Sequence, residues 1–330
     1  MAQLQAPLRI GLLTTAHMHI WSYVACMKER DDANIVGVWD DEVARGETFA
    51  QQTGVPFIGY LDDLLNVVDA VCVTSENNRH LELAEKAARA GKHILCEKPL
   101  VAREEDAAKL EEVIKATGVK LMTAFPCRFS PAFKRMKDRV KNGDIGAVKA
   151  LVGTNRGRCP FDWFVQKELS GGGAMIDHTV HVTDLMRDML GEEPVRVQAQ
   201  TGNNMYGQDW EDTAMVTLEF PSGVFATLDS SWSRPQTFKT WGDVTLTAVG
   251  EKGVIELDMF GAGLEHYHEG KTTYSLDGYG SNLDALMVDA FVRACLDDTD
   301  VPANVHDGLQ AARVAMAGYR SVKEGQPVAV

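Results

Sequence analysis

The first 125 residues alternate short apolar runs with longer segments of helical periodicity, and few folds accommodate such a pattern. Each apolar run has the length of a strand buried on both faces. The runs are 8–13, 34–39, 70–74, 93–96 and 119–124. The helical segments end at glycines such as Gly54, Gly91 and Gly118, which suit the left-handed end of a helix. Repeated strand–helix units predict a parallel, doubly wound sheet covered by helices.

The pattern changes after residue 125. Between residues 194 and 276 the chain shows successive strand-like segments. Hairpin turns are predicted at 221–223, at 250–253 and around Glu269-Gly270-Lys271. Clustered antiparallel strands of this kind predict one large, open sheet in an α+β arrangement.

We therefore expect an α/β chain of two domains. Residues 1–125 are predicted to form a Rossmann-type, dinucleotide-binding domain. Residues 126–330 are predicted to form an α+β domain with a mostly antiparallel sheet, which binds substrate and mediates oligomerisation.

The chain carries 33 basic and 47 acidic residues, so its formal net charge is −14. Such a surface repels phosphate backbones and anionic lipids, which argues against nucleic-acid and membrane partners. The six cysteines include no CxxC pair, which indicates reduced thiols. No apolar stretch approaches the roughly 18 residues of a membrane span. We expect a soluble, cytoplasmic protein.

The first strand leads into a turn where dinucleotide-binding chains carry the pattern G-x-G-x-x-G. Here the six positions are Thr14-Thr15-Ala16-His17-Met18-His19, so all three glycines are replaced. A pyrophosphate is held by backbone N–H groups and a helix N-terminus, which Thr15, Ala16 and His17 still supply. The hydroxyl groups of Thr14 and Thr15 add donors. We expect residues 14–17 to contact a dinucleotide.

The second strand ends in Asp40, which lies 26 residues after Thr14. A carboxylate there can accept hydrogen bonds from both ribose hydroxyls of an adenosine. It would also repel a 2′-phosphate, and Asp41 adds to this effect, so the expected cofactor is NAD rather than NADP. The residues leave open that Asp40 merely starts a loop or caps the next helix.

The segment Cys96-Glu97-Lys98-Pro99 follows an apolar strand, at the sheet edge where doubly wound folds bind ligands. A lysine there can approach a substrate oxygen, and its pKa falls if it is desolvated. The proline confines the backbone of Lys98 to extended conformations. By itself the segment also fits a surface lysine in a turn.

A second motif begins with Gly171-Gly172-Gly173 and continues into a predicted helix. Asp177, His181 and Asp184 follow at i, i+4 and i+7, on one helix face. A carboxylate beside an imidazole orients the ring and favours its protonated form, as general acid–base chemistry requires. The alternative is a solvated face with an incidental ion pair.

Metal binding is not expected. The pairs His17-x-His19 and His266-x-His268, together with His178 and His181, offer imidazoles. No H-E-x-x-H motif and no cysteine-ligand spacing accompanies them.

Taken together, these residues resemble the Gfo/Idh/MocA oxidoreductases. The resemblance rests on Asp40, on E-K-P at 97–99, on Arg128 with Pro131, and on G-G-G-x-x-x-D-x-x-x-H-x-x-D at 171–184. The ending A-G-Y-R-S-V-K-E-G at 317–325 adds to it, so the resemblance covers nearly the whole chain. The sequence departs from the family at the glycine turn, at Glu76, and at His178 and Thr179.

The resemblance implies hydride transfer between NAD(P) and one carbon of a sugar or polyol. It implies that Lys98, Asp177 and His181 surround the reacting hydroxyl, and that the open sheet packs on a partner subunit in a homodimer or homotetramer. We also expect the cofactor to contact Thr74, Asn77, His80 and Glu97, and the substrate to contact Arg128, Arg156, Trp163 and His178.

Two rival functions remain at this point. One is a glycoside-cleaving enzyme that oxidises its sugar transiently and reduces it again. The other is a non-catalytic sensor that binds a dinucleotide. An acid–base pair at Asp177 and His181 favours an enzyme.

Overall fold

The computed structural model describes residues 4–266, 275–278 and 280–330. The chain forms two compact units. Unit 1 comprises Met1–Pro126, Gln166–Gly171 and Asp284–Ala312, and unit 2 comprises Cys127–Val165, Gly172–Leu283 and Arg313–Val330. The first break lies within two residues of the boundary expected at residue 125. Unlike the expected domains, however, unit 1 also takes two later segments of the chain.

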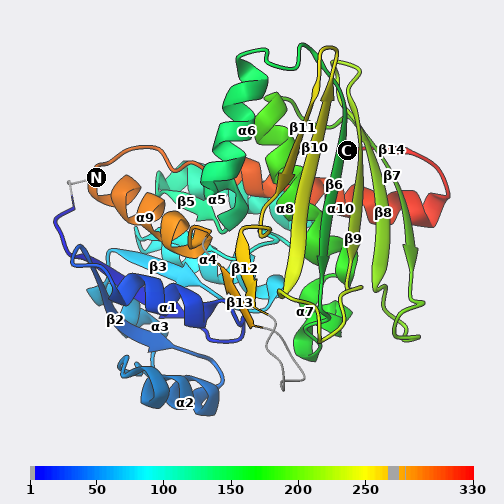
Figure 1. The fold of residues 1–330 in the computed structure, drawn as a ribbon. Helices are drawn as coiled ribbons and strands as arrows, with labels where there is room; N and C mark the ends of the chain where they lie inside the picture. The colour runs from blue at the N-terminus through cyan, green and yellow to red at the C-terminus, as the bar shows by residue number, and fades with distance from the viewer. Residues whose placement is uncertain (1–3, 267–274, 279) are drawn as a thin grey trace. The chain divides into compact units, whose positions relative to one another are not determined.

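Unit 1 is built on a parallel sheet of five strands in the order β2-β1-β3-β4-β5 (Figure 1). The strands are β1 (Leu8–Leu13), β2 (Ala33–Trp39), β3 (Ala70–Val73), β4 (His93–Cys96) and β5 (Leu121–Thr123). Their order reverses at β1, which pairs with β2 on one side and β3 on the other. Ligands of doubly wound sheets bind at the carboxyl ends of the strands beside such a reversal. The predicted parallel sheet is confirmed.

Helices connect these strands. They are α1 (Ile20–Lys28), α2 (Val43–Thr53), α3 (Leu61–Val67), α4 (His80–Arg89), preceded by the 3₁₀ turn η1 (Asn77–Arg79), and α5 (Glu104–Thr117). Gly54 and Gly118 end α2 and α5 with φ values of 73° and 67°, which confirms the predicted left-handed ends.

Unit 1 also contains most of α9 (Leu283–Leu296) and the short α7 (Lys167–Ser170). The hydroxyl of Ser22 in α1 donates to Asp284 at 2.5 Å, and Arg30 donates to Asp289 at 2.8 Å. Met287 and Phe291 of α9 are fully buried. A helix far along the chain therefore returns to the first unit and lies beside α1, a pairing that sequence periodicity does not specify.

Unit 2 is built on a seven-stranded sheet in the order β11-β10-β6-β9-β8-β7-β14. The strands are β6 (Val148–Gly157), β7 (Arg196–Gly202), β8 (Thr213–Glu219), β9 (Phe225–Ser231), β10 (Gly242–Gly250), β11 (Val254–Asp258) and β14 (Val328–Ala329). Only β6 and β9 pair in parallel among these strands, so the predicted mostly antiparallel sheet is confirmed.

The turns predicted at 221–223 and 250–253 join antiparallel pairs, as expected. The turn predicted at Glu269-Gly270-Lys271 lies outside the described residues, between β12 (Gly263–His266) and β13 (Ser275–Gly278). Sequence reasoning missed β6, which precedes the predicted strand region and lies near the middle of the sheet.

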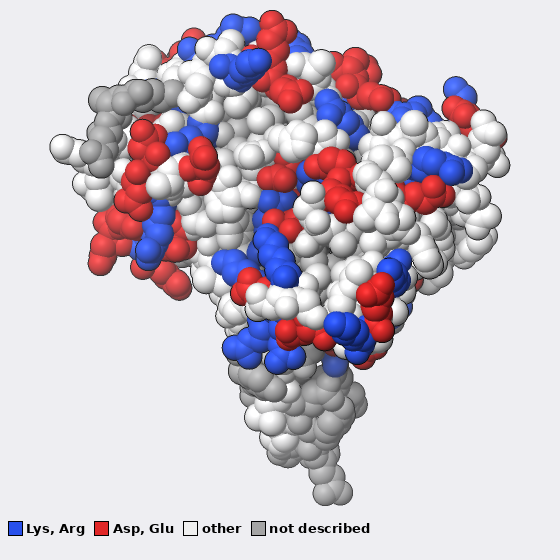
Figure 2. Space-filling view, turned by 90° about the horizontal axis from the view of Figure 1, so that it is seen from above, with Lys and Arg blue, Asp and Glu red and all other residues white. Residues whose placement is uncertain are grey.

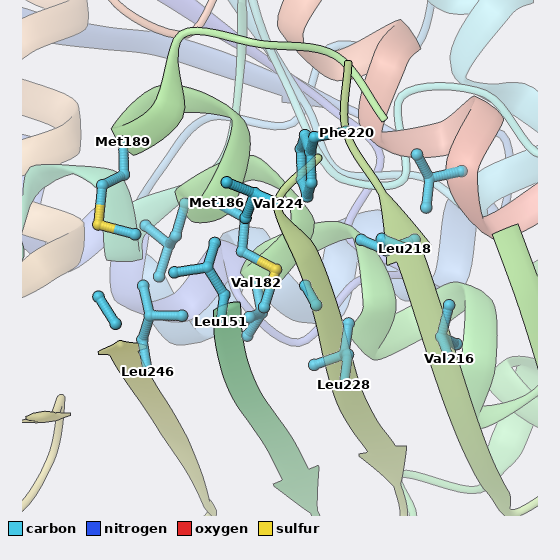
Figure 3. Close-up of a cluster of buried hydrophobic side chains, with 14 of the residues drawn as sticks. Leu151, Val182, Met186, Met189, Val216, Leu218, Phe220, Val224, Leu228 and Leu246 are labelled. Carbon is cyan, nitrogen blue, oxygen red and sulfur yellow. The ribbon is translucent and has the colours of Figure 1, made fainter. Parts of the chain in front are cut away.

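Helix α8 (Ala174–Leu190) covers one face of this sheet (Figure 1). Val182, Met186 and Met189 of the helix lie against strand side chains that include Leu151 and Leu228 (Figure 3). Gly153 in β6 permits this packing, because a Cβ there would lie 2.5 Å from Val182. The core of unit 2 therefore fixes α8, and with it the D-x-x-x-H motif. Two further helices, α6 (Pro131–Lys141) and the second part of α10 (Val305–Glu324), belong to the unit.

Acidic and basic side chains are interspersed over the surface seen in Figure 2. Many form ion pairs, such as Lys86 with Glu82 at 2.7 Å. Within the described part of the chain, none of the helices combines the length and the apolar character needed to cross a bilayer.

Candidate functional site

The turn between β1 and α1 has the backbone that the family pattern assigns to glycine. Thr14 has a φ of 63°, in the left-handed region that β-branched residues seldom adopt. Its N–H donates to the carbonyl of Trp39, and its carbonyl accepts from the hydroxyl of Thr74. The hydroxyl oxygen of Thr14 is buried and has no hydrogen-bond partner among the described residues. A strained turn with an unsatisfied hydroxyl fits a site that receives a polar ligand, as a dinucleotide is.

Two of the three N–H groups assigned to the pyrophosphate, those of Thr15 and His17, make internal hydrogen bonds in the structure. Thr15 N–H donates to Asp40 at 2.8 Å, and His17 N–H donates to the carbonyl of Thr74 at 2.9 Å. Contact between these groups and a pyrophosphate therefore remains a prediction.

Asp40 is almost fully buried, and it holds the turn in place. Its carboxylate accepts from the N–H and hydroxyl of Thr15, from the N–H of Glu42, and from two nitrogens of Arg45 at 2.9 and 2.7 Å. The bond from Glu42 shows that Asp40 also shapes the entry into α2, as the alternative reading proposed. Ribose binding by Asp40 remains a prediction.

A pocket of about 330 Å³ opens beside Thr15 and Arg45, the two residues that hold the Asp40 carboxylate. Its lining includes Thr15, Trp21, Glu42, Arg45 and Phe49. The rings of Trp21 and Phe49 lie 4.7 Å apart. The pocket therefore combines an aromatic wall with charged groups from the start of α2.

Glu97 is the centre of a buried polar cluster at the end of β4. His19 Nδ1 lies 3.0 Å from its carboxylate, His17 Nε2 lies 3.8 Å away, and the Tyr23 hydroxyl donates to it at 2.5 Å. Burial opposes ionisation of Glu97, but the charges of His17 and His19 outweigh it and hold its pKa well below the usual range. Conversely, Glu97 raises the pKa of His19 despite the effect of burial.

His17, His19 and Glu97 also form a group that could hold a metal, since one donor atom from each lies within 4.8 Å of the others. Polar contacts already link the three residues: the N–H of His19 donates to His17 Nδ1, and His19 Nδ1 lies 3.0 Å from Glu97 Oε1. The expectation of no metal remains a prediction.

Asn77 and His80 fix the segments on either side of the cluster. The amide of Asn77 donates to the carbonyl of Ser170 at 2.8 Å, and His80 Nδ1 lies 2.8 Å from the carbonyl of Pro99. Burial lowers the pKa of His80, which favours a neutral ring. His80 thus helps to position the backbone beside Lys98. Lys98 is 3% exposed, and its peptide bond to Pro99 is cis.

In unit 2, the glycines before α8 allow close contacts with other segments. A Cβ at Gly172 would lie 1.8 Å from the Tyr319 hydroxyl, and one at Gly173 would lie 2.2 Å from the Glu211 carbonyl. The Glu211 carboxylate accepts from the N–H of Gly173 and from Tyr319. An acidic group at a helix N-terminus is electrostatically favourable. These contacts set where α8 begins, three residues before Asp177.

Asp177 is held by groups that sequence reasoning did not assign to it. Its Oδ2 accepts from the indole N–H of Trp232 at 3.0 Å and lies 3.2 Å from His178 Nε2. Gly157 leaves the space for His178, because a Cβ there would lie 2.7 Å from the imidazole ring. His181, one turn later, is half-buried. Lys98 belongs to unit 1, whereas Asp177 and His181 belong to unit 2.

The predicted substrate-wall residues have mixed environments. Arg128 is buried and donates to Asp184 at 2.8 Å, while Arg156 pairs with Asp243 at 3.1 Å. Trp163 is 4% exposed and stacks on Phe164 at 3.9 Å. Contact of any of these residues with a substrate remains a prediction.

Sequence reasoning missed Trp232, Arg45 and Tyr23, and it placed His19 only along the dinucleotide turn. The first two hold predicted site carboxylates, and the last two lie against Glu97. Tyr23 and His19 are four residues apart at the start of a helix, a spacing that places them on one face. Trp232 is 55 residues from Asp177 and carries no local signal.

Comparison with known proteins agrees with this architecture. Residues 11–125 match the model described as "Oxidoreductase family, NAD-binding Rossmann fold", and residues 133–256 match the GFO/IDH/MocA C-terminal domain. The fold and these matches define an NAD-binding oxidoreductase architecture. The chain belongs to the Gfo/Idh/MocA family, which confirms the resemblance inferred from its motifs.

Three similar proteins illustrate the range of the family. Myo-inositol 2-dehydrogenase of Thermotoga maritima is 31% identical, over 79% of each chain. The 2,7-anhydro-N-acetylneuraminate hydratase of Escherichia coli is 32% identical, over 71% of this chain and 63% of its own. The crystal structure of GenD2 from gentamicin A biosynthesis, in complex with NAD, is 25% identical, covers 100% of this chain and 98% of its own, and gives a TM-score of 0.90.

Proposed function

We propose that this protein is an NAD-dependent dehydrogenase that oxidises or reduces one carbinol carbon of a sugar or polyol. The observation that carries the proposal is that one chain contains both a Rossmann sheet with a buried lysine and a helix with a candidate acid–base pair. Unit 1 has a Rossmann sheet with a buried lysine at the end of β4, and unit 2 has Asp177 and His181 on one helix. Likeness to an inositol dehydrogenase supports the substrate class.

We assign the proton transfer to His181, which takes the hydroxyl proton of the substrate. Asp177 stabilises the imidazolium that results, and Trp232 and His178 hold its carboxylate in place. Lys98 stabilises the negative charge that develops on the substrate oxygen. A nicotinamide bound to unit 1 would supply the acceptor for the hydride of the same carbon.

We propose NAD rather than NADP. Arg45 and Arg79 contribute two positive charges near the end of β2, against four negative charges of Asp40, Asp41, Glu42 and Glu76 that pair with them. The net charge of this group is 2 − 4 = −2, which disfavours a 2′-phosphate. The adenosine would use the pocket lined by Trp21, Arg45 and Phe49.

We further propose a homodimer or homotetramer that forms through the outer face of the seven-stranded sheet. Val152, Met215 and Phe225 are 47%, 55% and 54% exposed on β6, β8 and β9. They alternate along their strands with buried residues and therefore share the outer face. Apolar residues gathered on one face favour a protein partner. All six cysteines are buried and form no disulfide among the described residues, which supports a reducing, cytoplasmic location.

The test is a panel of sugars and inositols offered with NAD or NADP and followed by the absorbance of the reduced cofactor. We expect turnover with NAD on at least one member, and weaker turnover with NADP. Tight NAD binding without turnover on any member would instead favour the non-catalytic sensor.

A second candidate is a redox-neutral reaction, in which the sugar is oxidised, altered and reduced again. It is favoured by the likeness to a hydratase, whose name describes no net oxidation. Product formation without accumulation of NADH would identify this reaction, whereas NADH that accumulates in step with product would exclude it.

A further inference from the structure

Unit 2 exposes an aromatic ring that the proposed mechanism does not use. Phe161 is 46% exposed. Phe161 and Asp162 have φ values of 55° and 51°, in the left-handed region that non-glycine residues rarely adopt. Two successive non-glycine residues in this conformation are energetically unfavourable. Such strain persists only where the surrounding structure enforces it, and it is typical of ligand-binding segments.

Phe161 is the first of four rings in contact. Its ring meets Tyr206 edge-on, with centroids 5.5 Å apart. Tyr206 contacts Trp210, and Trp210 contacts Trp232, each at 5.5 Å. Trp232 is fully buried and donates to Asp177. We call these four residues the aromatic ladder. It connects the exposed Phe161 to the carboxylate assigned to catalysis.

The buried carboxylate of Asp212 anchors the loop that carries Tyr206. Asp212 is 0% exposed, and its Oδ2 accepts from the N–H groups of Met205 and Tyr206 at 2.9 and 2.8 Å. The hydroxyl of Tyr206 also donates to the carbonyl of Trp232. These bonds fix the loop to the segment that directly follows β9 and carries Trp232, so the outer rings are presented in a defined position. A pre-positioned surface binds more tightly because little conformational entropy is lost.

The chemistry of these rings suits a sugar. The C–H face of a pyranose is apolar and packs on an aromatic ring, while its hydroxyl groups stay at the rim. Asp162 and Asp209 are exposed acids next to the ladder in sequence and can accept hydrogen bonds from hydroxyl or ammonium groups. A single ring reacting at Asp177 would leave Phe161, at the far end of the ladder, uncovered.

We propose that Phe161, Tyr206 and Trp210 form a subsite for a second sugar ring, so that the substrate is a glycoside of at least two rings. The inference rests on the proposed function, because that function places the reacting ring at Asp177. Phe161 is then a specificity-determining residue that stacks on the ring that does not react.

The test compares the binding of one-ring and two-ring sugars to the full chain. Glucose is paired with maltose and with cellobiose, and glucosamine with chitobiose. Binding is followed by tryptophan fluorescence, with and without NAD, since Trp210 and Trp232 belong to the ladder. We expect at least one two-ring sugar to bind more tightly than its one-ring partner. Phe161→Ala should lower that affinity ratio about 3- to 10-fold, and Phe161→Tyr should retain it.

Phe260→Ala is the matched control, because Phe260 is 41% exposed in the same unit and lies outside the ladder. It should leave the ratio unchanged. The inference is overturned if no two-ring sugar binds more tightly than its one-ring partner, or if Phe161→Ala weakens both equally. NADH formation separates the subsite proposal from the dehydrogenase proposal. If one-ring sugars are turned over and Phe161→Ala leaves the affinity ratio unchanged, the subsite proposal alone is overturned. Conversely, Phe161-dependent binding without turnover on any sugar overturns the dehydrogenase alone.

Discussion

The two units hold their important carboxylates in different ways. In unit 1, Asp40 pairs with the guanidinium of Arg45, and Glu97 lies against His17 and His19. In unit 2, Asp177 accepts from the neutral indole of Trp232 and lies beside His178. An ion pair can fix a backbone turn and neutralise the charge of an acid next to a bound ligand. A neutral donor instead orients the carboxylate and leaves the negative charge of the carboxylate to act on an imidazole. The difference suggests a binding role for the unit 1 acids and a chemical role for Asp177.

The largest effect expected is the loss of hydride transfer in Lys98→Met and in His181→Ala. Each removes a group that handles charge or a proton in the transition state, so single-turnover rates should fall about 10²- to 10⁴-fold. Lys115→Met, at an exposed lysine of α5, is the control. Wild-type rates in both site variants would contradict the catalytic roles proposed for Lys98 and His181, and with them the chemical role proposed for unit 2.

Arg128→Met tests whether charge pairing in unit 2 serves stability. Arg128 is 7% exposed and the side chain of Asp184 is 0% exposed, so the variant leaves a buried carboxylate without this cation. We expect the free energy of unfolding to fall by about 3–5 kcal/mol, measured by urea denaturation.

Arg9→Met provides the comparison, since Arg9 is 53% exposed in its pair with Asp69. It should shift the urea transition far less, because water screens the exposed pair. Equal shifts in the two variants would contradict a structural role for Arg128.

Trp232→Phe tests the role of the neutral donor in unit 2, because it keeps an aromatic side chain but removes the indole N–H that is bonded to Asp177. A hydrogen bond to a charged acceptor contributes about 1.5–3 kcal/mol, so kcat/KM should fall about tenfold to hundredfold. The acid limb of the pH–rate profile should also move to higher pH, because the ionised carboxylate loses a donor. A loss of stability with an unchanged profile would mean that Trp232 serves packing alone.

Glu97→Gln tests the unit 1 cluster by its pH dependence. The pKa of His19 is raised in the folded protein, so its contribution to stability is present below the ordinary value of 6.5 and is lost as pH rises through the folded value. The pKa of Glu97 is lowered, so its contribution is present above 4.5 and is lost as pH falls through the folded value.

The variant should therefore be most destabilised, relative to wild type, between about pH 4.5 and 6.5. Urea unfolding of both proteins across this range and up to pH 8 gives the measurement. A stability difference that is the same at every pH would argue against the His19–Glu97 ion pair. This is the smallest effect expected, since His19 is partly exposed.

The sequence by itself determined the class of each unit and was enough to propose the segments that carry the chemistry. Short apolar strands followed by glycine-ended helices leave little choice but a parallel sheet, whose strand ends share one edge. Asp40, Thr74 and Lys98 could therefore be assigned to that edge from their positions after strands. The i, i+4 spacing of Asp177 and His181 likewise needed only helix geometry.

Tertiary structure alone decided the partners of these residues. Trp232 lies 55 residues from Asp177, Arg128 lies 56 from Asp184, and the rings of the aromatic ladder come from three separate segments. Such contacts depend on strand order and on loop positions, which periodicity does not encode. The same holds for α9, which belongs with a sheet formed almost 160 residues earlier in the chain. Local periodicity fixes which face of an element is apolar, but only packing of the whole chain selects the surface that the face meets.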